Sequence, residues 1–140
     1  MAKQPSKATR KNRSKFAKWI WENQVKPIIR WHARNRCEKC GASGEVKQLH
    51  CHHIDGRQNM YMLICQMNIV LLCANHHTMG QVSAHSESRT GREEFDEWLV
   101  GYKGKEIIDE LARLRGCSPK LTLLDLEGIY QDNRDFLNND

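Results

Sequence analysis

The chain has 140 residues, 28% of them charged, and a formal net charge of +5. This length allows one small domain with extensions and excludes two independent hydrophobic cores, so a bound metal would be a useful source of stability. No apolar run is long enough to cross a membrane, and the basic N-terminus is not followed by the apolar segment of a secretory signal. We therefore expect a cytoplasmic protein without a membrane partner.

The first fourteen residues are polar and basic and almost lack large apolar side chains. We predict that residues 1–14 form a disordered arm, or one that orders only on binding. A basic arm suits an anionic partner, most commonly nucleic acid, and a solvated arm that aids solubility is the alternative of equal weight. Arg10, Lys11 and Arg13 are the candidates for contacts to DNA phosphates.

Residues 15–115 are predicted to form the folded domain, which begins with two helical segments. Apolar residues recur at helical spacing up to position 35, and Pro27 is expected to begin the second segment because it lacks the N–H that an interior turn needs. A turn-rich knuckle at 37–44 then leads into a predicted strand at 45–54. The remaining expected elements are a loop at 55–66, a short buried strand at 69–73, a short helix from about Ala74 that ends near Gly80, one or two helices at 91–115 with a break near Gly101 and Gly104, and an acidic extension at 116–140 with a short final helix.

Four residues in two pairs have the spacing of a structural zinc site. Cys37 and Cys40 form a C-x-x-C pair, and Cys73 and His76 repeat the same gap further along the chain. Two side chains three positions apart in a turn can reach one ion together, and Zn²⁺ prefers thiolate and imidazole ligands. The pattern predicts a tetrahedral site whose binding energy contributes to folding. The other cysteines have no partner at this spacing and are interpreted as ordinary buried or free thiols: Cys51, Cys65 and Cys117.

The chain has seven histidines, and six of them lie between positions 50 and 85, a density that core packing does not explain. Phosphodiester hydrolysis needs a base that takes a proton from water, a cation that stabilises the developing charge, and a group that orients the base. His53 can be the base, His52 and His77 can hold the cation, and Asn68 can orient the base by hydrogen bonding. Adjacent residues of a strand point to opposite faces, so the two neighbouring histidines can serve one site only where the strand ends.

Two other functions compete with a nuclease. A zinc-stapled DNA-binding module without catalysis would keep the zinc ligands and use the basic arm for phosphate contacts. That alternative leaves the remaining histidines and Asn68 without a role. A zinc-dependent nucleobase deaminase needs a Glu two residues after a ligand His and a later P-C-x-x-C motif, and this chain has neither.

The window from Cys37 to His85 resembles the HNH endonucleases, also called ββα-metal nucleases. The motifs that carry the resemblance read CEKC, CHHIDGR, NIVLLC and CANHH in this chain. Ala84-His85 and Trp98-Leu99 are similar to flanking motifs of a phage-associated branch. The resemblance implies an α+β fold with a small, treble-clef-like ββα-metal core and a zinc knuckle, flanked by N- and C-terminal helices. It also implies DNA as the partner, in the cytoplasm of a bacterial or phage-infected host cell.

Carried over residue by residue, the resemblance implies that His53 is the general base and that His52 and His77 ligate the catalytic metal. Asn68 corresponds to the residue that orients the base or supports the metal. His85 is implied as a third ligand or as a contact to phosphate. The cofactors implied are a structural Zn²⁺ and a divalent catalytic ion, which is Mg²⁺, Mn²⁺ or another transition metal.

Three further residues near these motifs have two interpretations each. His76 stands where many members of the family carry cysteine, and Zn²⁺ accepts imidazole as readily as thiolate, so only the fourth ligand is in question. Arg57 is placed where a guanidinium can grip a phosphate, or it is a surface arginine. His50 shares a strand face with His52 and is interpreted as a surface side chain, the alternative being a group that supports the site.

Overall fold

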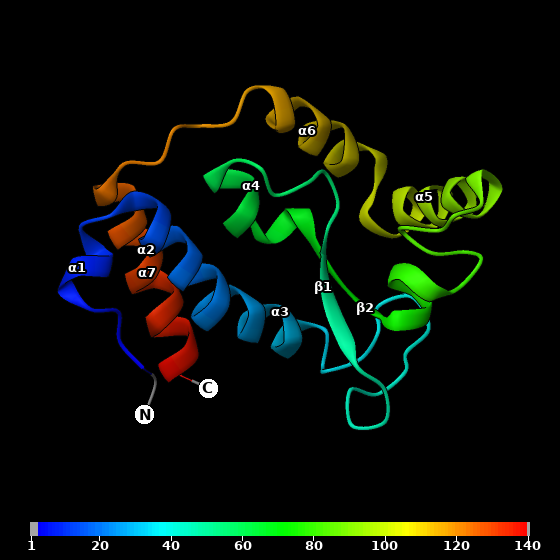
Figure 1. The fold of residues 1–140 in the computed structure, drawn as a ribbon, viewed down its shortest axis with the longest axis horizontal. Helices are drawn as coiled ribbons and strands as arrows, with labels where there is room; N and C mark the ends of the chain where they lie inside the picture. Colours follow the sequence, from blue (N-terminus) through cyan, green and yellow to red (C-terminus); the bar gives the residue numbers. More distant parts are fainter. Residues whose placement is uncertain (1–2, 140) are drawn as a thin grey trace.

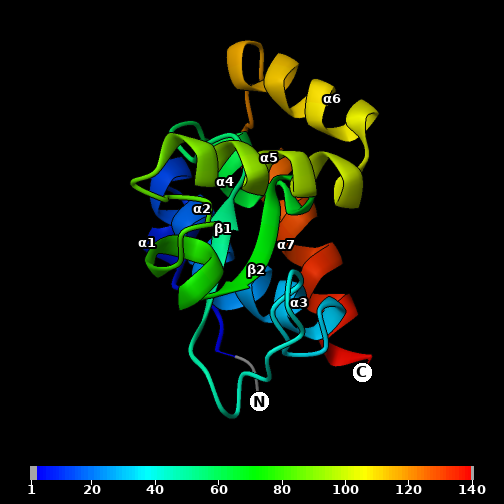
Figure 2. The same ribbon diagram turned by 90° about the vertical axis from the view of Figure 1, so that its right-hand side faces the viewer.

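The computed structural model describes residues 3–139 and has an α+β architecture, in which helices surround a two-stranded antiparallel sheet (Figure 1). Figures 1 and 2 show α2, α3 and α7 on one side of the sheet and α5 on the other. The elements are, in chain order, α1 (Lys7–Arg10), α2 (Arg13–Ile20), the π-helical η1 (Trp21–Val25), α3 (Lys26–His32), β1 (Leu49–His53), α4 (Met60–Ile64), the 3₁₀ turn η2 (Gln66–Asn68), β2 (Ile69–Cys73), the π-helical η3 (Asn75–Met79), α5 (Arg89–Lys103), α6 (Lys105–Gly116) and α7 (Leu123–Asn138).

The sheet pairs β1 with β2 in a register that sets Leu49 opposite Cys73 and His53 opposite Ile69. All of β2 is buried, as its continuous apolar run IVLLC predicts. The predicted strand at 45–54 begins only at Leu49, because the preceding backbone turns back: the N–H groups of Val46 and Lys47 donate to the carbonyl of residue 43. The strand that carries the adjacent histidines is therefore short and ends just after them.

Side chains of β1 alternate between the two faces of the sheet. His50 and His52 lie on the face toward η3, where both rings contact His77. His53 lies on the face toward the helices, where its ring contacts Trp21 of η1. The two histidines of the pair therefore face different neighbours, as the strand geometry predicts.

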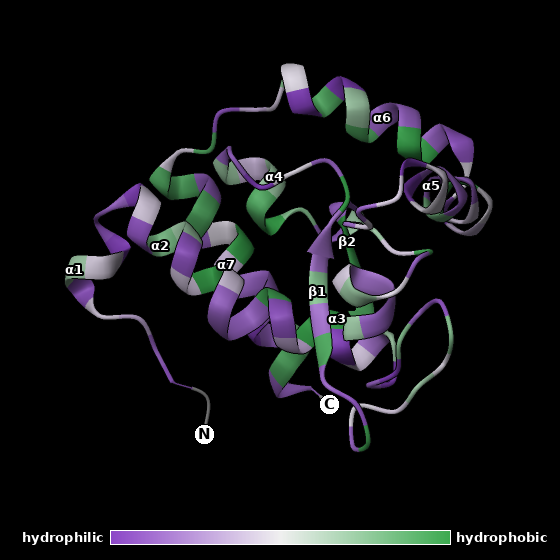
Figure 3. Ribbon diagram, turned by 45° about the vertical axis from the view of Figure 1, so that its right-hand side comes forward, coloured by the Kyte–Doolittle hydropathy of each residue, from purple (hydrophilic) through white to green (hydrophobic). Residues whose placement is uncertain are grey.

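The core lies between the sheet and a long helical run formed by α2, η1 and α3, which follow one another without a break. Phe16, Ile20 and Val25 on this run are fully buried. Tyr130 of α7 packs its ring 5.8 Å from that of Phe16, measured between centroids. Figure 3 shows apolar segments on α2, α4 and α7. Pro27 lies in the first turn of α3, as predicted, where a missing N–H costs no helical hydrogen bond.

The prediction of a disordered N-terminal arm is wrong for the part of residues 1–14 that the structure describes, and residues 1 and 2 lie outside it. The helix α1 begins after Ser6, whose hydroxyl accepts the N–H of Thr9 at 3.1 Å. Arg10 forms a bidentate ion pair with Glu127 of α7, and its guanidinium lies 5.1 Å from the centre of the Tyr130 ring. Arg10 is thus engaged within the protein, whereas Lys11 and Arg13 are exposed.

The predicted loop at 55–66 contains the helix α4, which the sequence did not predict. Asn59 caps this helix by accepting the N–H of Met62 at 2.8 Å, and Met62 and Ile64 bury their side chains. The polar residues before α4 resemble a loop, but tertiary burial of its apolar face stabilises a helix too short to form alone.

The C-terminal region forms the predicted helices, and its final helix is longer than the short one expected. The break between α5 and α6 falls at Gly104, whose φ of 95° favours glycine, while Gly101 continues α5. The final helix α7 begins with a capping box between Thr122 and Asp125 and continues to Asn138. None of the described helices combines the length and the apolar character that crossing a bilayer requires.

Candidate metal centres

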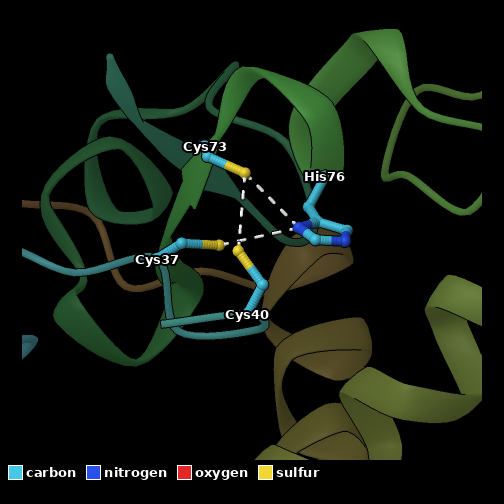
Figure 4. Close-up of side chains that lie close together, drawn as sticks. All are labelled: Cys37, Cys40, Cys73 and His76. Carbon is cyan, nitrogen blue, oxygen red and sulfur yellow. Dashed lines mark hydrogen bonds between the residues drawn. The ribbon is translucent and has the colours of Figure 1, made fainter. Parts of the chain in front are cut away.

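Cys37, Cys40, Cys73 and His76 come together although the two pairs are far apart in the sequence. Their ligand atoms all lie within 4.8 Å of one another. Figure 4 shows the three sulfur atoms and the imidazole of His76 turned toward a common point. We call this group the Cys3His cluster. The four residues that the spacing selected can hold one metal ion.

The distances within the Cys3His cluster fit tetrahedral zinc. Cys40 Sγ lies 3.8 Å from Cys73 Sγ, and His76 Nδ1 lies 3.4 Å from Cys73 Sγ and 3.8 Å from Cys37 Sγ. An ion about 2.3 Å from each sulfur at the centre of a tetrahedron requires edges of about 3.8 Å. A disulfide requires sulfur atoms about 2.05 Å apart, which the 3.8 Å between Cys40 and Cys73 excludes.

The knuckle that carries Cys37 and Cys40 is hydrogen-bonded to β2. Gly41 closes the turn by donating its N–H to Cys37 O at 2.8 Å, with a φ of 77° that favours glycine. Glu38 then pairs with Leu71 of β2: its N–H donates to Leu71 O at 2.8 Å, and its carboxylate accepts the Leu71 N–H at 2.6 Å. Its second oxygen accepts the Tyr102 hydroxyl at 2.7 Å. The sequence motif gave no sign of Glu38, because its partners are remote in the chain.

The surroundings of the Cys3His cluster favour the metal-binding protonation states of Cys37 and His76, which are a thiolate and a neutral imidazole. Burial raises the pKa of the Cys37 thiol, but hydrogen bonds from nearby backbone N–H groups more than offset this and lower the pKa overall. Burial, followed by the charges of Lys39 and Lys47, lowers the pKa of His76. Burial raises the pKa of Cys40. A thiolate and a neutral imidazole are the forms that bind Zn²⁺, and metal binding would release the remaining proton.

His52, His77 and His85 form a second group, which we call the three-histidine cluster. One ring nitrogen of each lies within 4.8 Å of the others. The ring centroids are 5.2 Å apart for His52 and His77, and 4.9 Å apart for each of the two pairs that include His85. The residues come from β1, from η3 and from the loop before α5. The structure thus brings His85 beside the two ligands predicted from the motif.

Two members of the three-histidine cluster, His52 and His77, are held in the neutral form. Burial, followed by the charges of His77, His85 and His53, lowers the pKa of His52 to about 3. Burial, followed by the charges of His85 and His50, lowers the pKa of His77 to about 4. Near neutral pH both rings therefore carry a free lone pair, which is what a divalent cation binds. Three protein ligands leave further coordination positions open, as in catalytic metal sites.

His50 belongs to this site, and its interpretation as a surface side chain is wrong. It is half-buried, and its Nδ1 lies 3.1 Å from Nδ1 of His77. A hydrogen bond at Nδ1 orients the His77 ring and leaves its Nε2 for an ion. The shared strand face of His50 and His52 was a signal for this supporting position, but the partner on η3 was not visible in the sequence.

His53 follows His52 in β1 but faces the helices, where it is held in a defined orientation. It is 8% exposed, and its Nε2 donates to Leu63 O at 2.9 Å, which leaves Nδ1 as the proton acceptor. The ring centroid lies 4.5 Å from that of Trp21. Burial lowers the pKa of His53, the Leu63 carbonyl raises it, and the charges of Arg57 and Lys26 lower it further. The ring is therefore neutral near pH 7, and Arg57 is close enough to influence it.

From the sequence we expected Asn68 to orient His53 by a direct hydrogen bond, but its side-chain hydrogen bonds go to other residues. Its side chain is fully buried, and its Oδ1 accepts the Asp55 N–H at 2.8 Å. Its Nδ2 donates to Gly56 O and to Met62 O, both at 2.9 Å. Asn68 thus ties the turn after His53 to α4. That helix supplies the Leu63 carbonyl that orients the histidine, so the influence of Asn68 on His53 is indirect.

The loop that carries His85 is fastened to both η3 and α5. Its backbone follows η3, with Ala84 N–H donating to His76 O at 3.0 Å and His85 N–H donating to His77 O at 2.9 Å. At α5 the loop packs against Gly91, where a Cβ would lie 1.7 Å from the carbonyl oxygen of Gln81. A side chain at this position would displace the loop backbone.

Gly91→Ala is expected to destabilise the protein by about 1–3 kcal/mol through overpacking against the loop. Gly101→Ala is the matched control in the same helix, because a Cβ there meets nothing within 4 Å. We expect Gly101→Ala to stabilise the protein by about 0.8–1.0 kcal/mol, since alanine has the higher helix propensity. Urea unfolding of both variants measures the difference. Equal unfolding midpoints would contradict the close contact between α5 and this loop.

Comparison with known proteins assigns no relative to the chain: no family model, no curated protein and no solved structure matches it. The chemistry and geometry of the two clusters are therefore the basis for a functional interpretation.

Proposed function

We propose that this protein is a metal-dependent endonuclease of the HNH type, which hydrolyses phosphodiester bonds in DNA. The observation that carries the proposal is the three-histidine cluster, with a fourth, separately oriented histidine next to it in the sequence. Three imidazoles from separate segments converge here, with His52 buried, His77 partly buried and His85 at the surface, and polar rings withdrawn from water without partners would cost free energy unless they bind something. Their arrangement suits a divalent cation with open coordination positions.

His53 is the general base in this proposal. Its Nε2 is occupied by the Leu63 carbonyl, so the tautomer with a free Nδ1 is favoured, and its lowered pKa keeps that nitrogen unprotonated near pH 7. The ring can accept a proton from an attacking water. A divalent cation bound by His52, His77 and His85 supplies charge stabilisation at the phosphate and the leaving oxygen. Arg57, which is exposed and close enough to His53 to affect its pKa, pairs with a phosphate oxygen.

The Cys3His cluster has a structural role in this proposal, with Zn²⁺ as its ion. It fixes the knuckle to the end of β2 and to the start of η3. His77 follows the ligand His76 directly, so the ion that holds one histidine also holds the next in place. A zinc-stapled DNA-binding module without catalysis would need this cluster alone, and the four histidines at positions 50, 52, 77 and 85 favour the nuclease over it.

Zinc-loaded protein is expected to convert supercoiled plasmid to the nicked circle only when Mn²⁺ or Mg²⁺ is added. His77→Ala is expected to reduce nicking about 100-fold or more and to abolish the binding of Mn²⁺ measured by calorimetry, because a ligand is lost. His85→Ala is expected to weaken Mn²⁺ binding as well, which a residue that only contacts phosphate would not do. Thr78→Ala is the matched control, because Thr78 is exposed beside His77 and outside the cluster.

Two results would contradict the proposal. Nicking by wild-type protein in buffer free of added divalent ions would show that hydrolysis does not require an added ion bound by the three-histidine cluster. Equal nicking by His77→Ala and Thr78→Ala would show that this cluster does not support hydrolysis. The zinc content of each sample, measured in parallel, separates loss of the second ion from loss of the structural one.

A further inference from the structure

One face of α3 carries the basic side chains of Lys26 and Arg30, and Arg34 follows just beyond the end of the helix, so that the three form a basic row. Residues four apart in a helix lie on the same face, about one turn from each other. Lys26 is paired with Glu22 at 2.8 Å. Among the described residues, 3–139, neither Arg30 nor Arg34 forms an ion pair, which leaves both charges available to a partner outside the protein.

The basic row begins beside the proposed base and leads away from it. Lys26 Nζ lies 5.3 Å from the centre of the Trp21 ring, and that ring is 4.5 Å from the ring of His53. One turn further, Arg30 Nη2 donates to Leu49 O at 3.2 Å, at the start of β1. His52 is three residues beyond Leu49 in β1, which corresponds to about 10 Å along the strand. A DNA strand cut at the site would therefore pass within reach of this helix face.

A groove of about 830 Å³ lies at the end of the row. Its walls are one proline and otherwise basic, aromatic or amide side chains, with no acidic residue among them: Pro27, Arg30, Trp31, His32, Arg34 and Asn35. Trp31 is 52% exposed. Its ring is held edge-on by Phe136 of α7, with ring centroids 5.2 Å apart. Half of a rigid indole is thus open to the groove and the solvent.

The backbone at the groove is also defined. α3 ends where Arg34 and Asn35 adopt left-handed conformations, with φ of 56° and 52°. The Asn35 N–H donates back to Arg30 O at 2.8 Å, which closes the last turn. Arg34 is therefore projected from a fixed helix end, and the groove is formed before any ligand binds.

We propose that this groove binds a single-stranded segment of DNA beside the scissile phosphate, with Trp31 stacked on an unpaired base and Arg30 and Arg34 on the backbone. The inference rests on the proposed nuclease for the position of the scissile phosphate. Basic grooves with exposed aromatic rings bind single strands, because every unpaired base offers a π-face. A continuous duplex keeps its bases stacked on one another and offers none. The substrate is then DNA with an unpaired region, such as a branch or a frayed end.

The test is fluorescence anisotropy of a labelled twenty-nucleotide oligothymidine and of a labelled hairpin duplex. Zinc-loaded protein is used without Mg²⁺ or Mn²⁺, so that binding is measured without cleavage. Trp31→Ala is expected to weaken binding of the single strand about tenfold and binding of the duplex less than about twofold, and Trp31→Phe is expected to retain most of the affinity. Leu124→Ala is the matched control, because Leu124 is also an exposed hydrophobic residue, on α7.

Arg34→Gln provides a second and independent measurement. Losing one phosphate contact is expected to reduce the salt dependence of single-strand binding by about 0.7 in the slope of log K against log salt concentration. Arg89→Gln is its control, because Arg89 is 86% exposed on α5, outside the groove. Melting temperatures of all variants establish that they are folded.

The inference is overturned if Trp31→Ala binds oligothymidine as wild type does, or if it loses affinity for the duplex to the same extent. It is also overturned if Arg34→Gln leaves the salt dependence unchanged. These results are separable from the proposed function. A protein that binds single strands through Trp31 but never nicks DNA would refute the nuclease, whereas one that nicks DNA with Trp31 irrelevant would refute only the groove.

Discussion

The Cys40→Ala variant is expected to lose about 3 kcal/mol or more of its free energy of unfolding, roughly one ligand's share of the 10–16 kcal/mol that structural Zn²⁺ supplies. At roughly 2–4 °C per kcal/mol for a chain of this size, the melting temperature falls by about 6–12 °C. Cys40 is the informative member of the Cys3His cluster because its side chain is exposed, so its removal without a metal would cost little packing. Thermal unfolding followed by circular dichroism, together with the zinc content of each sample, measures the effect.

Cys117→Ala is the matched control, because Cys117 is also exposed and lies outside the Cys3His cluster. We expect it to melt at the temperature of the wild type and to retain about one zinc ion per chain. A Cys40→Ala variant that melted at the same temperature as Cys117→Ala would show that Cys40 is not a ligand. Wild-type protein that held no zinc after dialysis would contradict the structural site as a whole.

His53→Ala is expected to slow plasmid nicking by about 10²–10⁴-fold, the range for loss of a positioned general base. Binding of Mn²⁺ and of DNA should stay close to that of the wild type, because His53 is not a member of the three-histidine cluster. Added imidazole is expected to restore part of the rate, since the small molecule can occupy the vacated space and accept the proton. The measurement is the single-turnover rate of nicking at saturating Mn²⁺, below the melting temperature of both proteins.

The pH dependence of the same rate provides the control. Burial and the charges of Arg57 and Lys26 lower the pKa of His53 from 6.5. The free base is therefore fully present near pH 7, and the rate is expected to fall only as the pH decreases below 6.5 and the ring takes up a proton. The His53→Ala variant should lack this decrease. An identical decrease in both proteins, or an unchanged rate in the variant, would contradict the assignment of His53 as the base.

The members of the Cys3His cluster and the buried strand could be predicted because their signals are local. A C-x-x-C pair places two side chains close to one turn, and the continuous apolar run IVLLC favours a buried segment. The break at Gly104 follows from the same kind of local rule, since glycine readily adopts the positive φ that ends a helix. These features needed no knowledge of what packs against them.

The errors concern contacts between remote residues. Arg10 looked like part of a free basic arm because its partner, Glu127, is 117 positions away. The helix α4 looked like a loop because its stability comes from buried side chains and not from helix propensity. The bonds of Asn68 to Asp55, Gly56 and Met62 depend on how the turn after β1 packs over α4, which its position before a strand does not reveal.

The sequence by itself determined which donor atoms this protein has and how they are grouped: three thiols with one imidazole, and a surplus of histidines around one strand. Only the tertiary structure decided which of them converge. The register of β1 on β2 sets His50 and His52 against His77, and the loop beside η3 adds His85. Spacing constrains side chains within one turn or one strand, whereas convergence of separate segments depends on packing, so the sites were visible in the sequence and their geometry was not.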